Sequence, residues 1–176
     1  MKAKIRALII LSILTVLLAS AYVLIPDGRQ SVSGGTQDKP GDAVVINDFP
    51  LGDLLALAIT NSRGSFGILN KADSLTMVSD REGSFSIPEM RAITYLACHL
   101  EGIRRLDTVV GEADIKDPLA HFSLILEGGR EYNYLILRKS PVSDDYLLFS
   151  EEDQCIFVIS RSSAEWFLRS AEDFLE

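Results

Sequence analysis

The chain has few of the side chains that most often carry catalysis or hold metal ions. Its 176 residues include two cysteines and two histidines. The sequence contains no CxxC, HExxH or GxSxG pattern, no P-loop and no dinucleotide-binding glycine motif. A zinc site would need more ligands at workable spacing than His99 and His121 provide. We therefore expect a non-enzymatic protein with no catalytic residue, cofactor or bound metal.

Basic residues are scarce beyond the first few positions. Lys2, Lys4 and Arg6 account for three of the 17 basic residues, so 14 basic and 25 acidic residues follow, a net charge of −11. Nucleic acids and anionic lipid headgroups are bound by basic patches that release counterions. The acidic balance argues against both as ligands, and we expect no nucleic-acid partner.

Charged residues, glycine and proline are absent from Ala7 to Ile25, a run of 19 residues. At about 1.5 Å per residue, a helix of this length spans roughly 28 Å, close to the thickness of the bilayer hydrocarbon core. The three cations stand before the run and no matching cluster follows it, so the positive-inside rule places the N-terminus in the cytoplasm. We expect residues 1–25 to be a single-pass signal anchor in the cell membrane, with the rest of the chain extracytoplasmic.

A cleaved signal peptide is the alternative, because Ala19-Ser20-Ala21 is an A-x-A pattern after a basic and an apolar region. Cleavage after Ala21 would still export the domain. We favour a retained anchor because the apolar run continues beyond Ala21 to Ile25.

Residues 26–41 are rich in glycine, serine and polar groups, with Val32 as the one aliphatic residue. A segment of this composition cannot bury a core, so we interpret it as a flexible linker. Residues 42–176 have the length of one domain with a single core.

Apolar spacing predicts an α+β fold for this domain. A strand at 43–47, a hairpin of 54–60 and 65–70 and a strand at 74–79 precede an amphipathic helix from Pro88 to Ile103, which Arg104 and Arg105 follow. Further strands are predicted at 121–127, 131–138, 146–150 and 155–159, before a helix that begins at about Ser162. The predicted order is ββββα-ββββα, an antiparallel sheet with both helices on one face.

Aromatic residues are concentrated in the second half of the chain, and an exposed aromatic face beside an acidic rim would suit protein recognition. We take Tyr132, Tyr134, Tyr146 and Trp166 as candidates for a protein-interaction surface. Cys98 and Cys155 could form one disulfide in an oxidising compartment, or remain buried thiols.

The segment from Ala113 to Tyr132, ADIKDPLAHFSLILEGGREY, resembles the core pattern of a domain family of unknown function, DUF4340. The segments Asp145–Leu148 and Cys155–Val158 are similar to the two strands that follow in that family. The segment Asp53–Asn70 resembles the first hairpin of that family, and Pro88–Leu106 is similar in position to its helix. The chain departs from the pattern at Asp114–Asp117 and at Arg138, where the family has Gly-Leu-Asp and a turn glycine.

The resemblance implies a single-pass or exported protein, of a kind often encoded near ABC transporters of the gliding-motility type, and it carries no catalytic residues. Together with the anchor, it leads us to expect a membrane-tethered extracytoplasmic domain that binds another protein, as an accessory of a transporter or cell-envelope complex. The alternative is an exported small-ligand sensor or enzyme that uses a cleft between sheet and helices.

Overall fold

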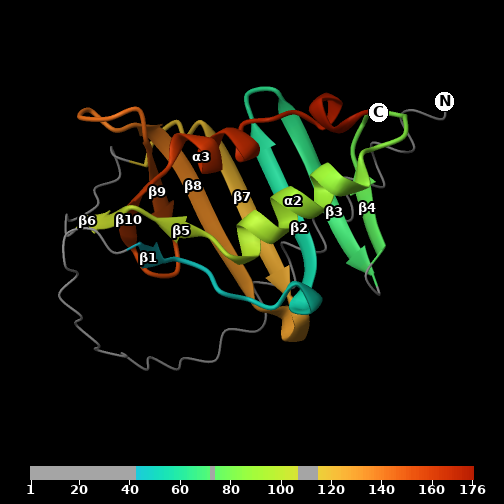
Figure 1. Ribbon diagram of the computed structural model, residues 1–176, viewed down its shortest axis with the longest axis horizontal. Helices are drawn as coiled ribbons and strands as arrows, with labels where there is room; N and C mark the ends of the chain where they lie inside the picture. The colour runs from blue at the N-terminus through green and yellow to red at the C-terminus, as the bar shows by residue number, and fades with distance from the viewer. Residues whose placement is uncertain (1–42, 72–73, 107–114) are drawn as a thin grey trace. The chain divides into compact units, whose positions relative to one another are not determined.

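The computed structural model describes residues 43–71, 74–106 and 115–176 (Figure 1). The predicted anchor at 1–25 and the predicted linker at 26–41 lie outside these ranges. Within the described ranges, no helix combines the length and the apolar character needed to cross a membrane. The described residues all belong to the predicted outer domain, 42–176.

An antiparallel sheet of eight strands is the main layer of this domain. Its strands lie in the order β4-β3-β2-β7-β8-β9-β10-β6, and Figure 1 shows them as a twisted row behind the helices. A separate ribbon pairs β1 (Val44–Val45) with β5 (Glu101–Gly102). The bounds in the large sheet are β2 (Leu54–Asn61), β3 (Gly64–Lys71), β4 (Ser74–Val78), β6 (Arg104–Leu106), β7 (Ala120–Leu126), β8 (Glu131–Lys139), β9 (Tyr146–Ser150) and β10 (Cys155–Ile159).

The hairpin of β2 and β3 follows from its turn residues. The side-chain Oδ1 of Asn61 accepts a hydrogen bond from the backbone N–H of Arg63 at 2.8 Å, and Gly64 has a φ of 133°. A side chain at Gly64 would be strained in this conformation. The predicted turn at Asn61–Gly64 is confirmed.

Two α-helices, α2 (Ile87–Cys98) and α3 (Arg161–Phe167), cover one face of the sheet (Figure 1). Pro88 lies in the first turn of α2, where its missing N–H is not needed. The Ser160 side chain caps α3 by accepting a hydrogen bond from the backbone N–H of Ser163 at 3.1 Å. Short 3-10 helices η1 (Leu51–Asp53), η2 (Glu127–Gly129) and η3 (Ala171–Phe174) complete the described elements. The predicted class, an antiparallel sheet with two helices, is confirmed.

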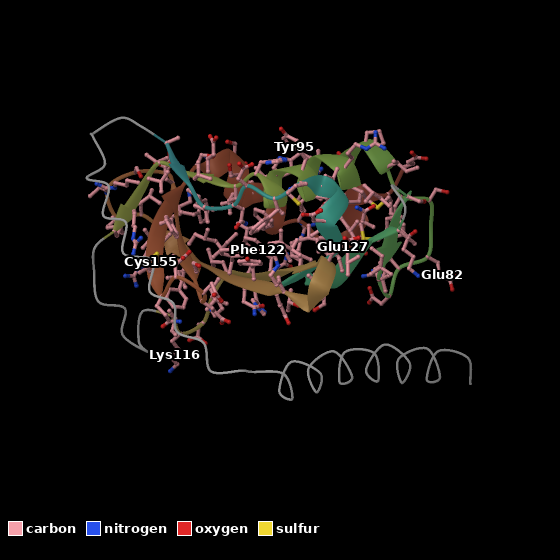
Figure 2. The ribbon with its side chains drawn as sticks, turned by 90° about the horizontal axis from the view of Figure 1, so that it is seen from below. Glu82, Tyr95, Lys116, Phe122, Glu127 and Cys155 are labelled. Carbon is pink, nitrogen blue, oxygen red and sulfur yellow. The ribbon has the colours of Figure 1, made fainter. Side chains whose placement is uncertain are left out.

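The core lies between the sheet and the helices. Alternation along β7 sends Phe122 into this layer, and Figure 2 shows it there, between the sheet and the helices. Its ring is fully buried and stacks on Phe167 of α3, with centroids 4.0 Å apart, and on Tyr134 of β8, at 4.9 Å. This aromatic stack joins the two central strands to the second helix.

The predicted helix is too long at its C-terminal end. α2 stops at Cys98, and the chain then forms β5 and β6, so Arg104 and Arg105 lie in a strand. Leu100 and Gly102 are buried while Glu101 and Ile103 are exposed, which is the two-residue period of a strand. The Leu100 carbonyl accepts hydrogen bonds from the backbone N–H groups of residues 46 and 47, so tertiary pairing replaces the helical bonds. The order of elements along the chain therefore differs from the predicted ββββα-ββββα, because β5 and β6 follow α2 before β7 begins.

A second apolar cluster lies on the opposite face of the sheet. Its members come from β8, β9 and β10 and are at most 7% exposed: Leu137, Leu147, Phe149, Ile156 and Val158. Every residue of β9 and β10 is therefore buried, because one set of side chains faces the helices and the alternate set belongs to this cluster. Leu106, Leu135 and Ile115 pack around it.

Candidate functional site

The four predicted interaction aromatics do not form an exposed surface. Tyr134 and Tyr146 are 2% and 8% exposed and belong to the core, because the alternation of β8 and β9 points them toward the helices. Tyr132 packs against Phe49, with ring centroids 4.7 Å apart. Trp166 is partly buried and lies under the guanidinium of Arg169, 4.4 Å from its ring centroid. The prediction of an aromatic docking face on these residues is wrong for the two buried tyrosines.

Tyr134 instead belongs to a buried polar connection. Its hydroxyl donates a hydrogen bond to Oδ1 of Asn47 at 2.5 Å, and Nδ2 of Asn47 donates to the Ala97 carbonyl at 2.9 Å. Asn47 is 2% exposed. Burial raises the pKa of the Tyr134 phenol far above its usual range, so it remains a neutral donor. The connection ties β8 to the end of α2 and does not supply a reactive group.

Cys98 and Cys155 are buried thiols that do not form the disulfide considered above. Cys98, at the end of α2, is close enough to Asp53 for the charge of Asp53 to raise its pKa. Asp53 directly precedes β2, whereas Cys155 is the first residue of β10, four strand positions from β2 in the sheet. Four strand spacings amount to roughly 19 Å, beyond the reach of a disulfide. Burial, with a smaller contribution from Asp53, raises the pKa of Cys98 to about 11.

A thiol titration checks this assignment. We expect the purified full-length protein, denatured without reductant, to yield two thiols per chain, because both cysteines are unlinked. The native protein should react slowly at neutral pH, since both side chains are buried and the Cys98 thiolate forms only near pH 11. Recovery of no thiol after denaturation would show that the two cysteines are bonded.

The two histidines have different surroundings. Nδ1 of His99 is 3.1 Å from Oδ1 of Asp48, and its ring contacts Tyr95, with centroids 4.4 Å apart. His121 is exposed on β7, on the face of the sheet opposite the helices. Among the described residues, no group of three or more His, Cys, Asp and Glu side chains is arranged to hold a metal ion.

The two edges of the sheet differ in how they are protected. β6 is three residues long, and two of these are Arg104 and Arg105. β4 is five residues long, Ser-Leu-Thr-Met-Val, with no charge and no proline, and its register against β3 runs from Ser74 to Val78 without a bulge. Among the described strands it pairs only with β3. Natural proteins usually protect such edges with charge, proline, bulges or very short strands, so β4 is the unprotected edge.

A cavity of about 210 Å³ opens between α2, η1 and the β3–β4 hairpin, lined by Leu51, Asn70, Leu75 and Arg91. Asn70 is 8% exposed, and its Nδ2 donates to the Leu51 carbonyl at 3.1 Å. Its Oδ1 is buried without a hydrogen-bond partner. An unsatisfied buried acceptor costs about 1–3 kcal/mol, so this oxygen is a feature that needs an explanation.

Sequence reasoning missed both the cavity and the exposed aromatic residue of α2. Tyr95 is 58% exposed, and Figure 2 shows it on the outer side of the helix. Its position between Arg91 and His99, off the stripe of Met90, Ile93 and Ala97, was a signal that it faces solvent. The cavity left no such signal because its lining comes from four separate elements.

No family model matches the chain, and no curated protein or solved structure matches it either.

Proposed function

We propose that this protein is a membrane-anchored, extracytoplasmic, non-catalytic domain that binds a protein of the cell envelope, such as a transporter subunit. The apolar run from Ala7 to Ile25 supports the anchor, and the resemblance to DUF4340 points to the same setting. The observation that carries the binding proposal is the unprotected edge of β4. The partner contributes an extended segment that pairs with this edge and continues the sheet.

Pairing with β4 would use the backbone groups that β3 leaves unused. In an antiparallel ladder, alternate residues direct both their N–H and C=O groups to the same neighbour, so the outer side of β4 offers donors and acceptors in a regular row. The absence of charge along Ser74–Val78 removes the repulsion that commonly keeps other strands away. Strand addition of this kind takes its affinity from main-chain hydrogen bonds.

Side chains along β4 would give the pairing its selectivity. Leu75 and Met77 face the helices and are partly buried, while Thr76 and Val78 face the other side of the sheet and are exposed. A partner strand with apolar residues on its helix-facing side would extend the core over Leu75 and Met77. The acidic outer domain would disfavour a strongly acidic segment at the same place.

A lysine in the middle of β4 tests this proposal. Full-length protein is cross-linked in membranes and purified, and the proteins recovered with it are quantified. Thr76→Lys should lower recovery of the partner at least tenfold, because a charged lysine would have to be desolvated at the new interface. The matched control is His121→Lys, an exposed position on the same face of a central strand, which should leave recovery unchanged.

Replacing the anchor tests whether the outer domain alone binds the partner. A version with an unrelated anchor should recover the same partner, since the proposal assigns binding to the outer domain. Equal recovery with Thr76→Lys and the wild type, at unchanged folding, would contradict docking at β4. A dimer of this chain that Thr76→Lys dissolves would assign the edge to self-association, and the proposal of a partner protein would fail.

A further inference from the structure

The register of the neighbouring strands determines which backbone groups of β4 point away from the sheet. In an antiparallel ladder, alternate residues direct both backbone groups to the same neighbour. A two-residue turn joins β2 to β3, so the flanking pair of Asn61 and Gly64 exchanges hydrogen bonds. The even-numbered residues of β3 therefore bond to β2, and its odd-numbered residues bond to β4.

The pairing of β3 with β4 extends this alternation to the edge of the sheet (Figure 1). The odd-numbered residues of β3 lie opposite three residues of β4, namely Ser74, Thr76 and Val78. These three use their backbone groups on β3, so Leu75 and Met77 direct theirs outward. Within the described residues, no backbone hydrogen bond from another segment reaches Leu75 or Met77.

A hydrogen bond on the other side of β2 agrees with this assignment. The N–H of Leu126 donates to the Arg130 carbonyl at 2.9 Å, so the even-numbered residues of β7 bond to β8 and its odd-numbered residues bond to β2. In the register of β7 against β2, His121 lies opposite Thr60. The even-numbered residues of β2 thus bond to β7, and Asn61 is left to bond to β3.

The outward backbone groups belong to the two residues of β4 whose side chains face the helices. Leu75 and Met77 are partly buried against the core, whereas Thr76 is exposed on the other face. Antiparallel residues that exchange hydrogen bonds have their side chains on the same face of the sheet. Two partner residues, one position apart, would therefore cover Leu75 and Met77, and apolar side chains would bury the most apolar surface there.

Asp80 supplies a negative charge just beyond the end of β4. Its side chain is 81% exposed, and its ion pair with Arg81 is long, at 4.0 Å. The residues after Arg6 also carry a net charge of −11. In an antiparallel partner, a basic residue that precedes the apolar pair would lie near Asp80 and complement this charge.

We infer that β4 binds an antiparallel segment with the pattern basic-x-apolar-x-apolar, whose two apolar residues exchange backbone hydrogen bonds with Met77 and Leu75. The inference rests on the proposed strand addition at β4. It adds which backbone groups take part and which kind of segment they select.

The first test titrates a labelled peptide, Lys-Thr-Val-Thr-Val-Thr, with the full-length protein in detergent and follows fluorescence anisotropy. We expect saturable binding that Met77→Pro weakens at least tenfold, because proline lacks the N–H that the peptide needs. An edge strand tolerates proline where the N–H faces solvent, so this variant should fold, and its unfolding midpoint checks this. The matched control, Met77→Ala, keeps the N–H and should bind within threefold of the wild type. Equal affinities of the two variants would overturn the inference.

Methylated peptides test the same assignment without altering the protein. N-methylation of both valines should abolish binding, because their N–H groups face β4. N-methylation of the central threonine should leave the affinity within threefold, since its N–H faces away. Replacing the lysine with glutamate should weaken binding. Equal binding of the two methylated peptides, or no saturable binding of the unmethylated one, would contradict the inference.

These outcomes separate the inference from the proposed function. A partner that Thr76→Lys removes from cross-linked membranes, together with equal binding of the methylated peptides, would show that the partner pairs with β4 through other groups, and only the inference would fail. Peptide binding with the expected methylation pattern, without recovery of any envelope protein, would support the inference and contradict the proposed partner.

Discussion

Replacing Phe122 with alanine is expected to destabilise the domain by about 3–5 kcal/mol, the usual cost of removing a buried phenylalanine. The ring is fully buried and stacks on both Phe167 and Tyr134, so its loss leaves a void where β7, β8 and α3 meet. Native domains have a total stability of only about 5–15 kcal/mol, so the variant should lose a large part of it. Urea unfolding of the full-length protein in detergent, followed by tryptophan fluorescence, measures the change.

Val142→Ala is the matched control for Phe122→Ala. Val142 is 78% exposed, so its truncation should change stability by no more than about 0.5 kcal/mol. If Phe122→Ala behaved like this control, Phe122 would not occupy the centre of the core, and the packing of α3 on the sheet would have to be different.

Tyr134→Phe is the second substitution with a large expected effect. It keeps the ring in the core but removes the hydroxyl that donates to Oδ1 of Asn47 at 2.5 Å. The Asn47 oxygen would then be buried without a donor, which costs about 1–3 kcal/mol. The free energy of unfolding measures this cost, and a double-mutant cycle with Asn47→Ala isolates the coupling between the two side chains.

Tyr132→Phe serves as the control for Tyr134→Phe, two residues earlier on the same face of β8. Its hydroxyl makes no hydrogen bond to a described residue, so we expect a change within about 0.5 kcal/mol. An unchanged free energy of unfolding for Tyr134→Phe, or a double-mutant cycle with no coupling energy, would contradict the hydrogen bond between Tyr134 and Asn47.

Local sequence patterns predicted the strands correctly where the apolar residues of a segment followed a single period. The β2–β3 hairpin carried both alternation and a turn with its own side-chain hydrogen bond, and β9 and β10 were uninterrupted apolar runs. The end of α2 was predicted wrongly because Leu96, Leu100 and Ile103 fit a helical stripe, while Leu100 and Gly102 also fit a strand. Pairing with β1 and β10 decides between the two, and that pairing is non-local.

The candidate sites were less accessible to sequence reasoning. Alternation placed Tyr132 and Tyr134 on one face of a strand, but it did not show that the helices cover this face. The contrast between β4 and β6 depends on which strands end up at the edges, and the sheet order sets this. The cavity depends on Asn70 and Arg91 meeting across the gap between a strand and a helix.

The strand order also determines when the chain can finish folding. The strands β2, β3 and β4 form from neighbouring residues, yet the free side of β2 waits for β7, which pairs Leu126 with Leu54. Similarly, β6 remains without its neighbour until β10 has emerged. Closing such long loops before their contacts form makes folding slow. Until β7 is available, the β2–β3–β4 meander therefore has an open edge on both sides, and such unpaired strand edges are prone to aggregation.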